Sequence, residues 1–357
     1  MTSWSFDSEA ETGTWETVKS PVDVTLRAVT STANGPCAVG NKGYVIGRSE
    51  TEGWGVVIEN GPAAAENSLY TVAATDDGKR VWFAGGNGAL GYYDLEKHER
   101  RDFSEPKGMD ATITSLTVSG KRSTEKLLLA DDSGNVLPGE MKSDGVTMDW
   151  SHISQPAGDS ALNALCSSQQ GVGYGVDSNA NVWQTTSDEG WERVGIDDAS
   201  NSFYAAAADG GRILVGGGNG RVYVTPDFKV WTPFNVGNFT VETLDVDGDE
   251  MIAAGGSGNI VYRMGESDWQ NVEWSKSKTI LGVVLGQPSV GVGKGGTIVE
   301  QKPDDGDSWG GPKNPDDEPD STSSTSSTSG GSSSDSTSGD STNSTEEQQY
   351  DEDSTAS

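Results

Sequence analysis

Apolar and polar residues follow one another along this chain in a unit that recurs seven times. The unit begins with two apolar residues three positions apart, continues with a turn rich in Gly, Asn or Asp, and places an apolar residue two positions after that turn. The apolar pairs are Leu26/Val29, Leu69/Val72, Ile113/Leu116, Leu162/Leu165, Phe203/Ala206, Val241/Leu244 and Ile280/Val283. Repetition with a period of roughly 40 residues is typical of β-propellers, in which each repeat forms one blade.

The turn at the centre of each unit predicts a tight hairpin between two strands. Asn-Gly, Asp-Gly and Gly-Gly sequences supply the positive φ angles that tight hairpins require. We call these seven segments the central turns: 40–43, 85–88, 131–134, 177–180, 217–220, 255–258 and 293–296. Further turns, such as 76–79 and 209–211, divide each unit into four short strands. No segment before residue 303 has a sustained helical period, so the pattern predicts an all-β fold.

An aromatic residue marks the fourth strand of each unit and is followed by an apolar residue three positions on. The aromatic residues are Trp54, Phe103, Trp150, Trp191, Trp231 and Trp269, with Phe103 standing in for Trp. The seventh unit, 279–301, has none, but Trp15 and Val18 form the same pair near the start of the chain. We therefore predict a seven-bladed β-propeller over residues 1–302. The strand at Trp15 completes the last blade and removes its open sheet edge, and the Trp side chains fill the outer gaps between blades.

The composition changes after residue 302. Residues 303–357 are rich in Ser, Thr, Gly and Asp and end in the acidic run 346–353. Such a segment cannot bury enough apolar surface to offset its chain entropy, so we expect a disordered acidic tail. It acts either as a solubilising tail or as a modified spacer or tether.

The charge of the chain is strongly negative. Asp and Glu number 55 against 24 Lys and Arg, giving a net charge of −31, and the part before residue 303 retains a net charge near −18. Such a surface repels phosphate backbones and anionic membranes, so we expect no nucleic-acid partner and no membrane insertion. It favours adaptation to high salt, where ions screen self-repulsion, over an ordinary acidic protein.

The cysteines and the N-terminal sequence bear on the compartment. Cys37 and Cys166 each lie among small apolar residues, which predicts free, buried thiols rather than a disulfide. The first residues carry neither a basic region nor an apolar region of a secretory signal. We expect a cytoplasmic protein. The alternative is a protein of the cell surface or of a virion.

The central turns are the candidate binding surface. In propellers of this strand order they share one face with the loops that enter the first strand of each blade. These loops are longer and vary most, notably 58–67 and 104–111. Variable loops on a rigid ring commonly carry binding function. The candidate binding residues are Asn41, Lys42, Asn87, Asp131, Asp132, Asp177, Asn179, Asn219 and Lys294. We expect a monomeric ring that binds an unidentified protein or glycan.

No set of residues in the sequence predicts catalysis, a metal or a cofactor. His98 and His152, the only two histidines, lack metal-ligand spacing with each other or with the cysteines. Residues 186–191 and 225–231 resemble degenerate Asp-boxes, in which an Asp side chain locks a turn, and 245–250 is a tight turn rather than a calcium loop. We expect a non-enzymatic protein. A glycan-processing hydrolase or lyase that uses the central channel is the alternative.

The recurring Ala/Val-Gly-x-x-Gly-x-Val/Ile turn and Trp-x-x-Val strand resemble those of the BNR/YVTN/WD40-like propellers of haloarchaea. Some of these are related to propellers of the photosystem II assembly-factor type. The resemblance covers residues 1–302 and implies the fold and its lineage rather than a chemistry. From the sequence as a whole we expect a propeller that presents loops to its partner, and the alternative is a surface or virion adhesin with the tail as spacer. Assembly factors of that type carry arginines that hold their client. In this sequence Arg27, Arg48, Arg221 and Arg263 are scattered without an evident cluster, so the resemblance implies no photosynthetic role.

Overall fold

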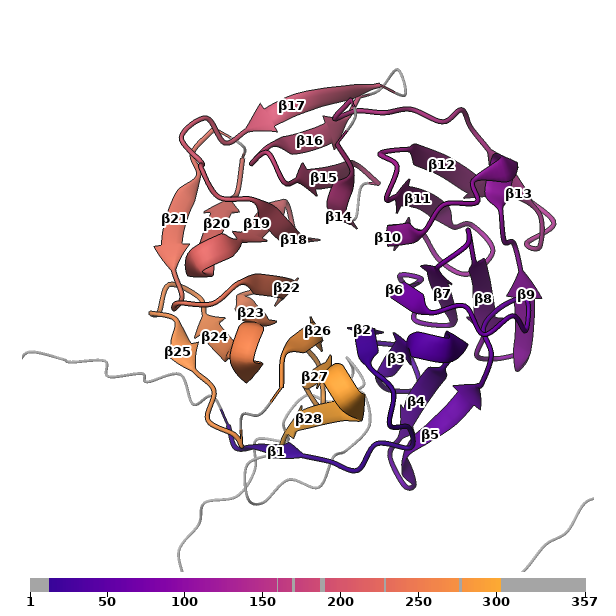
Figure 1. The fold of residues 1–357 in the computed structure, drawn as a ribbon, viewed down its shortest axis with the longest axis horizontal. Coiled ribbons are helices and arrows are strands. Elements are labelled where there is room, and N and C mark those ends of the chain that lie inside the picture. Colours follow the sequence, from indigo (N-terminus) through magenta and orange to yellow (C-terminus); the bar gives the residue numbers. More distant parts are fainter. Residues whose placement is uncertain are drawn as a thin grey trace, which may run out of the picture. The chain divides into compact units, whose positions relative to one another are not determined.

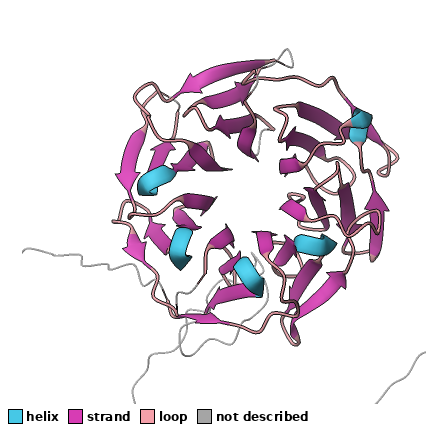
Figure 2. Cartoon of the chain, viewed as in Figure 1, coloured by secondary structure: helices cyan, strands magenta, loops and turns pink. Residues whose placement is uncertain are grey.

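Seven four-stranded antiparallel sheets stand around a central channel (Figure 1). The structure is a computed structural model that describes residues 13–158, 160–168, 171–186, 190–227, 229–275 and 278–302. Within these ranges the only helices are five short 3₁₀ turns (Figure 2). The predicted all-β, seven-bladed propeller is confirmed.

In each blade the strands follow one another in sequence from the channel to the rim, except that the outer strand of blade 7 comes from the N-terminal end. Blade 1 contains β2 (Leu26–Thr30), β3 (Cys37–Gly40), β4 (Val45–Ser49) and β5 (Gly53–Ile58); blade 2 contains β6 (Leu69–Ala74), β7 (Arg80–Gly85), β8 (Leu90–Asp94) and β9 (Glu99–Asp102). Blade 3 contains β10 (Ile113–Ser119), β11 (Lys126–Asp131), β12 (Val136–Met141) and β13 (Met148–Trp150); blade 4 contains β14 (Leu162–Ser167), β15 (Gly173–Asp177), β16 (Val182–Thr185) and β17 (Trp191–Gly195). Blade 5 contains β18 (Phe203–Asp209), β19 (Arg212–Gly217), β20 (Arg221–Thr225) and β21 (Thr232–Asn235); blade 6 contains β22 (Val241–Asp247), β23 (Glu250–Gly255), β24 (Ile260–Met264) and β25 (Gln270–Asn271). Blade 7 contains β26 (Ile280–Val284), β27 (Val290–Gly293), β28 (Thr297–Gln301) and, as its outer strand, β1 (Trp15–Thr17).

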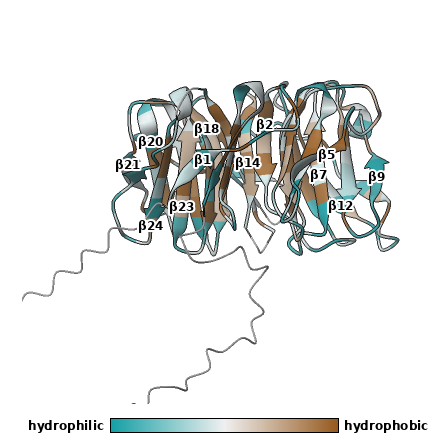
Figure 3. Ribbon diagram, turned by 90° about the horizontal axis from the view of Figure 1, so that it is seen from below, coloured by the Kyte–Doolittle hydropathy of each residue, from teal (hydrophilic) through white to brown (hydrophobic). Residues whose placement is uncertain are grey.

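The core lies between the sheets. The second and third strands of each blade carry apolar side chains on both faces, because each sheet packs against a neighbour on either side. Between blades 2 and 3, for example, Trp82 and Leu90 contact Leu116 and Leu129. At the rim, polar side chains prevail, and all four residues of β9 are exposed (Figure 3).

The N-terminal strand closes the ring as predicted. Trp15 pairs with Gln301 and Thr17 with Val299, and the Val18 N–H donates to Ile298 O at 3.0 Å. The Trp15 side chain, only 4% exposed, belongs to a cluster that joins blades 6 and 7. In Figure 1, β1 and β28 lie side by side although they come from opposite ends of the described chain.

A second contact ties blade 7 to blade 1. Glu300, on β28, is 8% exposed and accepts hydrogen bonds at Oε1 from Trp54 Nε1 (2.6 Å) and Arg48 Nε (2.9 Å). Charge-assisted bonds of this kind are stronger than neutral ones, particularly where water is excluded. The carboxylate therefore reinforces the junction that β1 closes.

Tryptophan side chains fill six of the seven gaps between blades. Each packs into the gap that precedes its own blade: Trp54 against blade 7, Trp150 against blade 2, Trp191 against blade 3, Trp231 against blade 4, Trp269 against blade 5 and Trp15 against blade 6. Trp54, Trp150 and Trp191 each pair with the fourth residue of the third strand of their own blade, which for Trp54 is Arg48. The predicted gap-filling role of these residues is confirmed.

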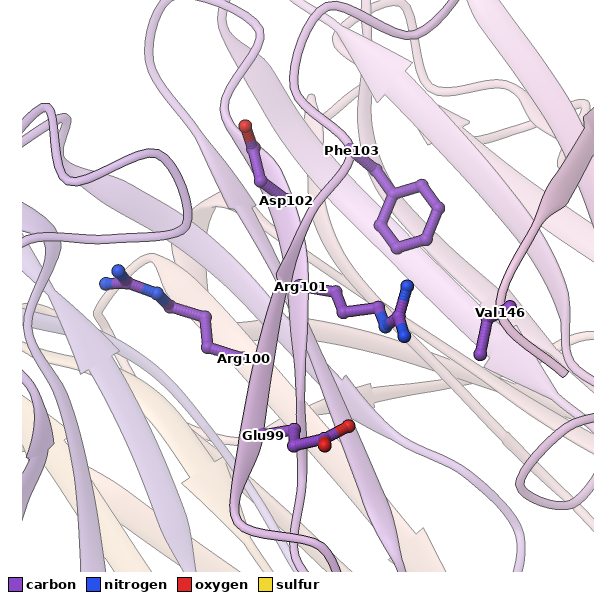
Figure 4. A pocket seen from close by; sticks show the side chains of 6 residues that line it. All are labelled: Glu99, Arg100, Arg101, Asp102, Phe103 and Val146. Atoms are coloured by element: carbon purple, nitrogen blue, oxygen red, sulfur yellow. The ribbon is translucent and has the colours of Figure 1, made fainter.

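Blade 2 departs from this pattern, and the prediction that Phe103 stands in for Trp is wrong. The residue at the Trp position is Arg100, which pairs with Tyr93. Phe103 lies three residues later and packs against Trp82 and Tyr92, with ring centroids 5.3 and 5.7 Å apart, in the gap between blades 2 and 3. Figure 4 shows Arg100 leaving β9 on the side opposite Arg101 and Phe103. The gap between blades 1 and 2 therefore has no Trp.

The remaining expectations concern the cysteines, membrane-spanning segments and the tail. Cys37 and Cys166 are free and buried, as predicted, and burial raises the pKa of each thiol to about 12. No helix in the described ranges is long and apolar enough to cross a membrane. The expected disordered tail, 303–357, lies outside the described residues, as do residues 1–12.

Replacing Trp15 with Ala is expected to lower the free energy of unfolding by about 3–5 kcal/mol, because it leaves a cavity where a large buried side chain had packed. Chemical denaturation followed by circular dichroism measures the change. Val230→Ala, at a side chain that is 66% exposed, is the control and should shift stability by less than about 0.5 kcal/mol. A Trp15→Ala protein as stable as its parent would contradict the closure by β1.

Candidate functional site

The central turns and the loops that enter the first strands share one face, which we call the turn face. Hydrogen bonds join them directly: Gly61 N–H donates to Gly43 O at 2.9 Å and Gly88 N–H to Ala111 O at 2.9 Å. Glycine is required where the two segments meet, because a Cβ at Gly85 would overlap Ser68 O. The turn face is therefore a rigid surface made of backbone that packs on backbone.

Two of the nine predicted binding residues are not available to a partner. Asp131 and Asp177 are 1% and 0% exposed. Asp131 Oδ1 accepts from the N–H groups of Ser133 and Asn135, each at 2.9 Å, and Asp177 makes the equivalent bonds within its own turn. These carboxylates replace the glycine of the other central turns and lock the turn, so we correct their assignment from binding to structural.

The other seven predicted residues lie at the surface of the turn face. Lys42, Asn87, Asp132, Asn179, Asn219 and Lys294 are exposed, and Asn41 is half-buried. Some contact the loops beside them, as when Asn87 Nδ2 donates to Asn67 Oδ1 at 2.9 Å and Asn179 Nδ2 to Ser160 Oγ at 2.8 Å. The structure thus spreads them over the ring, one or two in every blade except blade 6, rather than gathering them into a cluster.

A β-bulge recurs at the same place in the first strand of all seven blades. In blade 1, Leu26 pairs with Gly40 and Ala28 with Val39, so Arg27 has no partner of its own in the ladder. A bulge changes the direction of the side chain at the extra residue. We call the seven extra residues the bulge ring: Arg27, Tyr70, Thr114, Asn163, Tyr204, Glu242 and Leu281.

The bulge ring surrounds the channel mouth on the turn face. Arg27 Nε donates to Asn41 Oδ1 of a central turn at 2.7 Å, and its guanidinium lies 4.3 Å from the centre of the Tyr70 ring in the next blade. Asn163 Nδ2 reaches the next blade at Phe203 O, at 2.6 Å. Tyr204 is 38% exposed. The ring therefore combines cationic, acidic, amide, hydroxyl, aromatic and aliphatic side chains, of which Tyr204 is exposed and the other six are half-buried.

Sequence analysis did not identify the bulge ring, although its signal is present. Residues on one face of a regular strand are two positions apart. The repeated apolar pairs are three apart, and both members of each pair face the core, with Leu26 fully buried and Val29 9% exposed. That spacing requires one extra residue between them.

The channel wall is held by hydrogen bonds between neighbouring first strands. Thr71 Oγ1 accepts from Leu116 N–H at 3.1 Å, and Ser115 Oγ accepts from Leu165 N–H at 2.9 Å. The wall encloses a cavity of about 420 Å³, and Asp245 is the only carboxylate among the described residues that line it.

The Asp245 carboxylate accepts a hydrogen bond from the neighbouring blade, and its pKa is raised. Its Oδ2 accepts from Leu285 N–H at 2.8 Å. Burial raises the pKa of this carboxyl to about 7, the Leu285 N–H bond opposes the rise, and the nearby charges of Asp247 and Asp209 add to it. At the channel mouth burial also raises the pKa of Glu242, while the charge of Lys294 opposes that rise.

The remaining polar groups have structural roles or are dispersed. Asp227, in one Asp-box-like segment, accepts at Oδ1 from Lys229 N–H at 3.0 Å and so locks its turn; residues 187–189 of the other segment lie outside the described ranges. Among described residues, no group of three or more His, Cys, Asp or Glu side chains is placed to hold a metal ion.

No known protein family and no curated protein matches the chain in sequence. Solved structures match it in fold. One described as "YCF48 bound to D1 peptide" is 13% identical, with a TM-score of 0.64 over 81% of this chain and 97% of that chain. "YCF48 from Cyanidioschyzon merolae" is 13% identical, with a TM-score of 0.63 over 81% and 99% of the two chains. "Crystal structure of RRP9 WD40 repeats" is 11% identical, with a TM-score of 0.66 over 81% and 97%. At these identities the similarity shows a shared WD40-like propeller fold.

Replacing Asp245 with Asn is expected to stabilise the protein above neutral pH. The folded-state pKa is about 7, above the unfolded value of about 3.9, so the parent loses stability as the pH rises from 4 through 7. Asn keeps an acceptor for Leu285 N–H but cannot ionise. We expect a gain on the order of 1–4 kcal/mol at pH 8, shrinking toward pH 4, measured by denaturation at both pH values. A difference that does not vary with pH would contradict this titration.

Proposed function

We propose that this protein is a non-enzymatic binding scaffold that receives a protein partner on its turn face. The observation that carries the proposal is the bulge ring. The same backbone irregularity occurs in seven blades, yet its side chain differs in nearly every blade, from Arg27 to Glu242 to Leu281. A rigid support that carries varied, partly exposed side chains is suited to specific recognition.

The chemistry of the bulge ring favours a protein partner over a glycan. Protein interfaces combine aromatic, charged and aliphatic side chains, with Tyr and Arg enriched. Glycan sites depend on exposed aromatic faces, and here one of the two tyrosines, Tyr70, is covered by the guanidinium of Arg27. A solved propeller that is similar in fold, described as "YCF48 bound to D1 peptide", agrees with a peptide or protein partner.

The channel gives little support to the alternative of a hydrolase or lyase. Such an enzyme needs an acid and a base, or a carboxylate with a cationic clamp, within reach of one substrate. Asp245 stands without a second carboxylate or an arginine among the described residues that line the cavity. An adhesin that uses residues 303–357 as a spacer is a form of the same binding function.

We further propose that the protein is adapted to high salt, in keeping with the resemblance to haloarchaeal propellers. The part of the chain before residue 303 carries a net charge near −18, which opposes a compact fold by self-repulsion. Screening shortens the reach of this repulsion from about 10 Å at 0.1 M salt to about 3 Å at 1 M.

The turn face is tested by placing a photo-crosslinking amino acid at position 204 or at position 230 of the full chain in the native host. Both lie in blade 5 and are exposed, but 204 is in the bulge ring and 230 lies at the turn between the third and fourth strands. We expect one protein to be captured at 204 and not at 230, and Tyr204→Ala to weaken its binding at least tenfold. Capture at 230 alone would contradict the assignment of the turn face.

Salt adaptation is tested by chemical denaturation in 0.1 M and 3 M KCl, followed by tryptophan fluorescence. We expect the free energy of unfolding to be greater in 3 M KCl. The gain should be smaller in a variant that carries Asp198→Lys and Glu266→Lys, two exposed positions, because it repels itself less. Greater stability in 0.1 M KCl would rule out the proposed adaptation.

A further inference from the structure

A groove opens in the one gap that has no tryptophan. Between blades 1 and 2 lies a cavity of about 360 Å³, lined by Val45, Gly47 and Val57 of blade 1 and by Val81, Tyr93 and Leu95 of blade 2. Trp54 also contributes to the lining, but its indole packs in the preceding gap, where it bonds Glu300 of blade 7. Val56 and Val57 are each 40% exposed, although large apolar side chains are mostly buried in this protein. We call this cavity the blade 1–2 groove.

A comparison of blade 2 with the other blades explains the groove. At the strand position that holds Trp in blades 1, 3 and 4, blade 2 has Arg100, and Arg100 does not line the groove. Its guanidinium turns toward the turn face, where Nη1 donates to Asn60 Oδ1 at 3.1 Å and to Gly61 O at 2.8 Å. On the side of blade 1, Gly47 contributes no side chain, whereas the equivalent residue of blade 7 is Glu300, which bonds Trp54.

The groove opens away from the turn face. The turns 32–36 and 49–53, which connect strands at the opposite end of blade 1, contribute to its lining, as does His98 at the equivalent end of blade 2. Toward the turn face the gap is closed by Pro62, which is buried against Gly91. A ligand can therefore enter the groove without meeting the surface proposed above.

We propose that the blade 1–2 groove is a binding site for a tryptophan side chain carried by a peptide segment of a partner protein. The choice of tryptophan rests on the molecule itself, since six gaps between the same kinds of sheets are each filled by an indole. An aromatic side chain that enters such a gap removes a large apolar area from water, both its own and that of the exposed valines.

The sector of the chain that contains the groove carries little of the protein's net negative charge. Residues 26–126, which include blades 1 and 2, contain 12 of the 24 Lys and Arg and have a net charge of −1. The remainder of the chain carries −30. The net charge of this sector therefore neither attracts nor repels a peptide strongly, and Glu52 lines the groove, so we expect the affinity to rest on the tryptophan side chain.

The experiment uses the full chain and an acetylated nine-residue peptide of Ser, Gly and Glu with one central Trp, titrated by calorimetry in a salt concentration at which the protein is folded. Two results are expected. The peptide binds, and the same peptide with Ala in place of Trp binds at least tenfold more weakly. Failure of the Trp peptide to bind at millimolar concentration, or equal binding of the Ala peptide, would overturn the proposal.

Two substitutions at one position locate the site. Arg100→Trp supplies the missing indole from within the chain, so it should weaken peptide binding at least tenfold and raise the melting temperature relative to Arg100→Ala. Arg100→Ala breaks the same two hydrogen bonds without filling the groove and should bind the peptide within twofold of the parent. Arg101→Trp, one residue along β9 on its other side (Figure 4), is the matched control and should leave binding unchanged.

Further variants cover the remaining outcomes. If Arg100→Trp does not fold, Val57→Gln tests the same groove at a half-exposed position, and unchanged binding there would overturn the proposal.

Trp4→Ala and Trp309→Ala test two tryptophans of this chain that lie outside the described residues. We expect neither to matter; a tenfold gain in affinity for the peptide would show that the chain itself occupies the groove and would overturn the assignment to a partner. Normal binding by the Tyr204→Ala variant separates this site from the turn face.

Discussion

Sheets that radiate from a common axis diverge, and the space between them must be filled at every radius. Near the channel, small residues such as Ala38 and Ala254 let the strands approach closely, and both are fully buried. At the rim the gap is wide enough for an indole. Packing at near-crystalline density is what makes a core stable, so a ring of seven sheets depends on this gradation of side-chain size. The closure by β1, the positions of the tryptophans and the groove beside Arg100 are consequences of the same constraint.

The architecture could be predicted because this constraint repeats. Seven gaps need seven similar sets of side chains, and a single sequence therefore contains seven copies of the same pattern. A repeated pattern does not show which residues face which side of the sheet in a copy that departs from the pattern. Phe103 satisfied the expectation of an aromatic residue near the end of blade 2, but the pairing of Arg100 with Tyr93 places Phe103 on the other face of the sheet. A shift of one residue exchanges the two faces of a strand, so composition alone could not decide between them.

The candidate site was predicted less completely, for two physical reasons. Turns with similar sequences differ in where their side chains point: Asp131 folds back onto its own backbone while the adjacent Asp132 faces solvent. Asn135, four residues after Asp131, accompanies the locked turn, and the same spacing joins Asp177 to Asn181. The bulge ring was missed because a bulge changes the direction of a side chain without changing its identity. The sequence thus predicted where the turns lie. Whether each side chain in them is free to contact a partner depends on hydrogen bonds that only the structure shows.

The pairing of β1 with β28 also has a consequence for how the molecule is made. A ribosome synthesises β1 first, and its partner appears nearly 300 residues later. At typical elongation rates of about 5–20 residues per second, the first strand must wait for some tens of seconds before it can pair. During that interval blade 7 does not exist, and the emerging blades form an open arc whose end sheets each expose an apolar face. The growing chain is therefore vulnerable to aggregation until the moment of closure, and the first strand of the propeller to be made is among the last to pair.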